Sequence, residues 1–197
     1  MSPRPSKADH LLATARALFQ QHGIRRVTVE EIVRHAGISK ATFYAHYANK
    51  TAIVRTVIEQ LFDEGVAAYQ AIVASDQPFP DKINALVDLK EAQTRTFGPA
   101  FIDDFLTISD PELLSVVQQR TAEQIERVAA FIRDSQARGD LRADLEPRFV
   151  IFLLNHFREL GAHPDLLALY PSSRELTMEL TTFFFYGIMG DRHHDRT

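Results

Sequence analysis

Small and hydrogen-bonding side chains gather between residues 40 and 46, at a spacing that suits one short helix. They are Lys40, Ala41, Thr42, Tyr44 and His46. Phe43 and Tyr47 are four residues apart, so in a helix they share an inward face and leave those five on the others. Lysine and threonine can donate to base edges, alanine can touch a thymine methyl, and tyrosine and histidine can donate to phosphates. The stretch therefore suits contact with a nucleic acid.

The residues just before this helix predict a turn that holds it against a preceding one. Thr28 is followed three residues later by Glu31, which is the capping box that starts a helix. Gly37 then supplies the positive φ with which the chain can turn, and Ser39 is a good N-cap for the next helix. Lys50 lies near the start of a later helix, where backbone N–H groups attract a phosphate, as they do at Thr28. The spacing predicts a helix-turn-helix.

The rest of the chain also shows helical periodicity, with glycine and proline falling between the apolar stripes. The expected helices cover 10–22, 28–36, 40–47, 49–74, 81–97, 100–107, 111–138, 147–160 and 173–189. Gly23 should end the first of them in a left-handed conformation. The predicted fold class is all-α. We expect a three-helix DNA-binding domain at residues 1–50 and a helical ligand-binding and dimerisation domain at 51–197.

Charge is distributed unevenly along the chain, whose formal net charge is −4. Residues 1–60 hold nine Lys and Arg against four Asp and Glu, a net charge of +5. The remaining residues hold 13 basic against 22 acidic groups, a net charge of −9. This asymmetry favours a basic head that meets phosphates and an acidic body that does not.

Composition and motifs argue against several other classes. The chain has no cysteine, so disulfides and thiolate zinc sites are excluded. No apolar run suits a signal peptide or a membrane span, so we expect a soluble cytoplasmic protein. The metalloprotease, phosphate-loop, nucleophile-elbow and dinucleotide motifs are missing, and the acid pairs Glu30-Glu31 and Asp103-Asp104 are adjacent and make poor dyads. We expect no enzyme activity, no cofactor and no metal, even at the tail sequence His193-His194-Asp195.

The segment TVEEIVRHAGISKATFYAHYANKTAIV, residues 28–54, closely resembles the N-terminal domain of the TetR family of bacterial transcriptional regulators. The matching positions are Thr28, Ile32, Ala36, Gly37, Ser39, Thr42, Phe43, Tyr44, His46, Lys50 and Ile53. The resemblance covers about residues 8–58. It implies phosphate contacts by Thr28, Tyr44, His46 and Lys50, and base-facing positions for Lys40, Ala41 and Thr42. Val33 and Tyr47 depart from the family's usual Ala and Phe, and Tyr47 must find a partner for its hydroxyl or place it at the rim of the core.

Two later stretches are apolar nearly all round a helix: FVIFLLNHF at 149–157 and MELTTFFFYGIM at 178–189. A helix that is apolar on every side must be covered on every side. One side can pack on its own protomer and the other on a partner, which predicts a homodimer through a four-helix interface with Phe184 at its middle. Deep burial inside one protomer is the alternative.

A ligand site is harder to place. Asn155 and His156 are polar residues within an apolar run, although a buried histidine is more often a core or interface residue. Phe97, Phe101 and Phe105 flank the break at Gly98-Pro99, where a pocket could open, although an aromatic stripe is more often plain core. Such a pocket would suit a lipophilic or aromatic molecule.

Together these patterns predict a sequence-specific DNA-binding regulator, a repressor released from a palindromic operator by a small lipophilic or aromatic ligand. Two alternatives stay open. One is a DNA-binding regulator that senses no small molecule. The other is a helical module that uses its helix-turn-helix to dock a protein.

Overall fold

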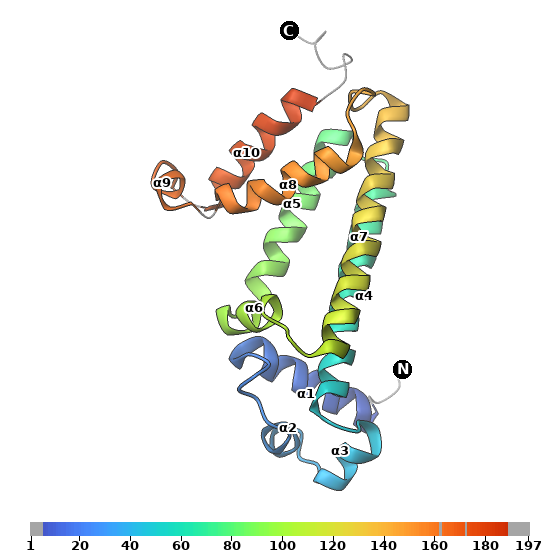
Figure 1. Cartoon of the computed structure of the whole chain (residues 1–197), viewed down its shortest axis with the longest axis vertical. Coiled ribbons are helices and arrows are strands. Elements are labelled where there is room, and N and C mark those ends of the chain that lie inside the picture. The colour runs from blue at the N-terminus through green and yellow to red at the C-terminus, as the bar shows by residue number, and fades with distance from the viewer. Residues whose placement is uncertain (1–5, 162, 172, 189–197) are drawn as a thin grey trace. The chain divides into compact units, whose positions relative to one another are not determined.

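The computed structural model describes residues 6–161, 163–171 and 173–188. These residues fold as helices joined by short connections, without a strand, which confirms the all-α fold class (Figure 1). The helices are α1 (Lys7–His22), α2 (Val29–His35), α3 (Lys40–His46), α4 (Lys50–Val73), α5 (Phe79–Thr96), α6 (Pro99–Leu106), α7 (Pro111–Arg138), α8 (Pro147–Gly161), α9 (Pro164–Leu167) and α10 (Ser173–Ile188). No helix among the described residues is long and apolar enough to cross a membrane.

The helix bounds follow the expected ones closely, with three differences. α1 begins at Lys7 because Ser6 caps it, accepting from the N–H of Asp9 while the Asp9 side chain accepts from the N–H of Ser6. α5 begins at Phe79, since Pro80 lies in the first turn, where no backbone donor is needed. The short helix α9 is an addition that sequence periodicity did not predict, because four residues are too few to show a period.

The chain divides into two compact units. The first joins the chain up to Ala68 with Ala92–Arg120, and the second joins Tyr69–Glu91 with the chain from Thr121 onward. The helices α4, α5 and α7 contribute residues to both units.

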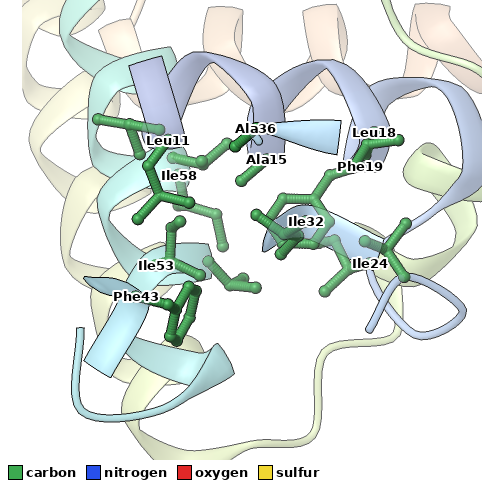
Figure 2. Packing of buried hydrophobic residues seen from close by; sticks show 14 of the residues in the cluster. Leu11, Ala15, Leu18, Phe19, Ile24, Ile32, Ala36, Phe43, Ile53 and Ile58 are labelled. Carbon is green, nitrogen blue, oxygen red and sulfur yellow. The ribbon is translucent and has the colours of Figure 1, made fainter. Parts of the chain in front are cut away.

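The core of the first unit is built from α1 to α4, α6 and the start of α7. Phe19, Ile32, Phe43 and Ile53 are fully buried and come from four different helices, so they tie α1 to α4 together (Figure 2). Truncating a fully buried phenylalanine to alanine costs about 3–5 kcal/mol in a core of this kind.

Gly23 ends α1, and its N–H donates to the carbonyl of Phe19 at 2.8 Å. Its φ of 86° is positive, as expected, but its ψ of 160° is extended. Gly23 therefore ends α1 with a positive φ but outside the left-handed helical conformation that the sequence predicted. A Cβ at this position would lie 2.7 Å from Oδ2 of Asp104, so the close approach of α6 also requires glycine.

The core of the second unit is rich in aromatic contacts. Phe79 stacks on Phe131 with ring centroids 5.9 Å apart, and Tyr69 meets Phe131 edge to face at 6.4 Å. Burial raises the pKa of Tyr69 to about 12, and its hydroxyl donates to the carbonyl of Arg127 at 3.4 Å. Phe184 of α10 is only 6% exposed and belongs to this core. The expectation that Phe184 lies at a subunit interface was therefore wrong.

Candidate functional site

The helices α2 and α3 form the predicted helix-turn-helix. Gly37 has a φ of 62°, the left-handed value that the turn needs, and no atom lies near its missing Cβ. The N–H of Ile38 donates to the carbonyl of Val33 at 3.0 Å, which closes the end of α2. Ser39 caps α3 by accepting from the N–H of Thr42 at 3.1 Å. Backbone N–H groups at the turn thus find hydrogen-bond partners among residues that are close in the sequence.

The helix α3 is anchored by one aromatic residue. Phe43 is fully buried, and the ring of half-buried Tyr47 lies 5.9 Å from it. Burial raises the pKa of Tyr47, and a hydrogen bond with Thr56 opposes that effect. The hydroxyl therefore has a partner, which is one of the two outcomes that the sequence left open. The candidate contact residues lie on the other faces. Lys40, Ala41, Tyr44 and His46 are exposed, and Thr42 is half-buried.

Lys40 forms an ion pair with Glu30 of α2. The ammonium group hydrogen-bonds the carboxylate and lowers the pKa of Glu30, and the carboxylate in turn raises the pKa of Lys40. Both side chains remain more than half exposed, so solvent screens the attraction between them. The predicted base-facing lysine is therefore partly neutralised by the neighbouring helix, a contact that the sequence analysis missed.

Thr28 caps α2 as predicted. Its hydroxyl accepts from the N–H of Glu31 at 3.2 Å, and its own N–H donates to Oε2 of Glu31 at 2.9 Å. This backbone donor holds the pKa of Glu31 below its usual range. Thr28 is exposed at the start of α2, so its side chain is accessible while it caps the helix.

Lys50 is more engaged with the protein than the sequence suggested. It is half-buried at the start of α4, and its Nζ donates to the carbonyl of Arg25 at 3.1 Å. Burial lowers its pKa, and the neighbouring carboxylates of Asp104 and Glu31 oppose that effect. The ammonium group has three donors, so this bond leaves others for a second acceptor.

Several other cations of the basic head are paired with carboxylates. Arg16 pairs with Glu64, Arg25 with Asp104, and Arg55 with both Glu59 and Glu112. Three of these acids, Glu64, Asp104 and Glu112, lie beyond residue 60 and belong to the acidic part of the chain. Within the first unit, acidic side chains from beyond residue 60 thus pair with basic side chains of residues 1–60. This pairing reduces the charge separation that the sequence suggested.

The candidate ligand residues do not line one site. Phe101 is 3% exposed in the first core, and the rings of Phe97 and Phe105 stack on it at 4.9 and 6.2 Å. His156, by contrast, belongs to the second unit, is exposed, and lies with its ring 4.2 Å from that of Phe152. The side chain of Asn155 lies outside the described part of the chain.

The described part of each unit contains a shallow hollow. The hollow of the first unit, about 220 Å³, lies among Ile24, Arg25, Lys50, Thr51, Val54, Asp104, Thr107, Ile108, Ser109, Asp110 and Leu113. The hollow of the second, about 440 Å³, lies among Arg133, Gln136, Ala143, Asp144, Leu145, Glu146 and Pro147. Neither lining includes a candidate ligand residue. No acid and histidine cluster suited to a metal occurs in the described residues, and 193–195 lie outside them.

Comparison with known proteins identifies the helix-turn-helix. Residues 11–57 match the family model described as bacterial regulatory proteins, tetR family. The chain is 26% identical over 148 residues to the HTH-type transcriptional repressor KstR2 of Mycolicibacterium smegmatis, covering 72% of this chain and 70% of that protein. Residues 11–57 thus form a DNA-binding domain of the TetR type. The chain is a DNA-binding transcriptional regulator.

Solved structures share its fold along nearly the whole length. The ketosteroid transcriptional regulator KstR2 of Mycobacterium tuberculosis superimposes with a TM-score of 0.62 at 20% identity, covering 95% of this chain and 97% of that one. A transcriptional regulator from Saccharomonospora viridis in complex with choline superimposes with a TM-score of 0.72 at 17% identity, covering 91% and 96%. At these identities the likeness concerns the fold alone.

Proposed function

We propose that this protein represses transcription from a palindromic operator, which it binds as a homodimer, and that a small lipophilic or aromatic ligand releases it. One observation carries the DNA-binding part. Phe43 is fully buried while Lys40, Ala41 and Tyr44 on the same helix are exposed. An anchored helix presents its free faces in one fixed orientation, which base readout requires. The relative from M. smegmatis is named a repressor, which supports repression.

The proposed contacts divide by chemistry. Lys40, Ala41 and Thr42 face the bases, because they lie in the first turn of α3, the end that enters the major groove. Thr28, Tyr44, His46 and Lys50 contact phosphates from the flanks. All seven residues fall within residues 1–50, which we propose as the DNA-binding domain, with 51–197 serving ligand binding and dimerisation.

The dimer proposal rests on aromatic side chains that one protomer leaves in solvent. Phe149 and Phe152 of α8 are 51% and 58% exposed, and Phe183 of α10 is 77% exposed. The helices α8 and α10 pack against each other in the second unit, and each also has a buried face. A second copy of the chain fits this surface, because a two-fold operator requires two recognition helices related by the same symmetry.

The ligand proposal rests on the relatives. One structural neighbour is named a ketosteroid regulator, and a ketosteroid is a lipophilic molecule. The candidate pocket residues in this chain are Phe97, Phe101, Phe105, Asn155 and His156. A second candidate function, a regulator that senses no small molecule, is favoured by the close stacking of Phe97 and Phe105 on buried Phe101.

Two experiments test the proposal. Selection of bound sequences from a random duplex library should enrich an inverted repeat whose half-sites lie about 34–36 Å apart, or a multiple of that distance. Enrichment of a single unrepeated site would contradict the dimeric mode. Calorimetric titration with a ketosteroid should show weaker ligand binding when operator is present, by the same factor with which the ligand weakens operator binding. Equal affinity with and without operator would favour the non-sensing regulator.

A further inference from the structure

The turn between α1 and α2 is held by a carboxylate that lies far away in the sequence. The backbone N–H of Arg25 donates to Oδ2 of Asp104 at 2.8 Å, and Nε of Arg25 lies 3.3 Å from Oδ1. Both oxygens of Asp104 thus meet the same residue. The Asp104 side chain is only 11% exposed, so these bonds replace most of its contact with water.

Two further residues, Thr107 and Lys50, also hydrogen-bond to Arg25. Its Nη2 donates to the carbonyl of Thr107 at 3.0 Å and to the Thr107 hydroxyl at 2.6 Å. Thr107 is the C-cap of α6, so the guanidinium satisfies a carbonyl that the helix leaves without an internal partner. The carbonyl of Arg25 accepts from Nζ of Lys50. The N–H, the carbonyl and the side chain of Arg25 are therefore all engaged.

Glycines allow α6 to approach this closely. The N–H of Gly98 donates to the carbonyl of Gln20 at 3.0 Å, and a Cβ on Gly98 would lie 2.8 Å from that oxygen. A Cβ on Gly23 would lie 2.7 Å from the Asp104 carboxylate. A side chain at Gly23 or Gly98 would collide with the facing helix. The close contact between α6 and the end of α1 therefore requires glycine at both positions.

We infer that Asp104 is a positioning residue for DNA binding, although it lies on α6 and outside the helix-turn-helix. It fixes the turn at Arg25, and the chain runs from that turn directly into Thr28 and α2. The placement of α2, and with it α3, on the end of α1 then depends on this carboxylate. The inference rests on the proposed DNA contacts of α2 and α3.

Removing the charge of Asp104 distinguishes a positioning role from a purely electrostatic one, because the two roles predict opposite changes in DNA affinity. Asp104 is an anion near a surface that meets a polyanion, so its removal should strengthen DNA binding if only electrostatics mattered. A positioning role gives the opposite result. The variant Asp104→Asn keeps the shape and one carbonyl oxygen but loses the ionic partner of Arg25. We expect operator affinity to fall about tenfold, because charge-assisted hydrogen bonds in a nearly buried site are among the stronger ones.

The matched control is Glu112→Gln. It removes the same charge from an exposed carboxylate that pairs with Arg55, and we expect operator affinity to change by no more than about twofold. The milder variant Thr107→Val removes one acceptor of Arg25 and should weaken operator binding about two- to fivefold. It keeps the test open if Asp104→Asn does not fold, which circular dichroism would reveal.

The measurement is fluorescence anisotropy with the selected operator and with random duplex, over a range of salt concentrations. A loss on the operator larger than the loss on random duplex, with an unchanged salt slope, supports positioning, because no phosphate contact is lost. Faster amide exchange at residues 24–28 with unchanged exchange in α4 supports it as well. Folded Asp104→Asn that binds operator as tightly as the unaltered protein, or equally reduced binding of both duplexes, overturns it. If the unaltered protein selects no operator, the proposed DNA contacts themselves are wrong.

Discussion

The ammonium group of Lys40, at the first position of α3, is ion-paired with the carboxylate of Glu30 on α2. A carboxylate on the neighbouring helix α2 is therefore positioned to compete with phosphate for Lys40. In the proposed complex, DNA displaces Glu30 from Lys40 or shares the lysine with it, and the carboxylate also repels nearby phosphates.

Removing the Glu30 carboxylate should reduce the preference of the protein for its operator over random duplex. We expect Glu30→Gln to bind random duplex about two- to fivefold more tightly and to steepen the salt dependence by about one unit per protomer, because Lys40 becomes free to neutralise a phosphate. Anisotropy titrations over a salt series measure both. Glu59→Gln is the matched control, since it removes an exposed carboxylate paired with Arg55 on α4. If both variants behave alike, the effect is one of net charge, and the Lys40 pairing has no part in it.

The neighbouring residues Phe183 and Phe184 should respond differently to a charge. Phe183 is 77% exposed, so Phe183→Glu should leave the protomer folded and prevent dimerisation. Phe184 is 6% exposed within the second core, so Phe184→Glu should unfold that unit or make the protein insoluble, because it buries an unpaired carboxylate. Sedimentation and circular dichroism distinguish the two outcomes. A folded dimer of Phe183→Glu at micromolar concentration would exclude this face of α10 as the interface.

The cap of α2 should contribute to stability in two separable ways. Thr28→Ala loses the hydroxyl that accepts from the N–H of Glu31 and should lower the free energy of unfolding by about 1 kcal/mol at pH 7. Glu31 acts through its charge. Because its pKa is lower in the folded chain than its ordinary 4.5, its stabilising effect is complete above that value and is lost as pH falls through the lowered one.

Glu31→Gln should therefore remove the contribution of this carboxylate to the pH dependence of stability. Thr28→Ala should retain most of it, since the backbone N–H at residue 28 still donates to the carboxylate and only the weaker hydroxyl contact at 3.3 Å is lost. Urea unfolding followed by circular dichroism at pH 7 and near pH 4 provides the comparison. If Glu31→Gln loses as much stability between pH 7 and pH 4 as the unaltered protein does, other carboxylates determine the acid dependence.

Base-facing and phosphate-facing residues should give different selection results. Thr42→Ala should change the base preferred at one position of each half-site, because a threonine reads a base with its hydroxyl and methyl. Lys50→Ala should weaken all sequences about equally, through the lost charge and the released Arg25 carbonyl. Repeating the library selection with each variant tests this. A shifted consensus for Lys50→Ala would move that residue into the group that reads bases.

Local sequence was enough to predict the helix-turn-helix. Thr28 with Glu31, the positive φ of Gly37 and the burial of Phe43 all depend on residues within a few positions of one another. Caps, turns and helix faces follow from backbone geometry and short-range hydrogen bonds, which the order of residue types already encodes. The all-α class followed in the same way from periodicity and from the positions of glycine and proline.

Tertiary structure alone decided which distant residues meet. Arg25 and Asp104 are 79 positions apart, and no local pattern marks Asp104 as the partner that holds the turn before α2. The same holds for the bond from Lys50 to the carbonyl of Arg25 and for the choice between Phe183 and Phe184 as the exposed residue of α10. The apolar run on α10 specified that several faces would be covered, but the rotation of the helix against its neighbours set which side chain its own protomer buries. That rotation results from packing summed over the whole unit, and the short-range spacing of residues does not contain it.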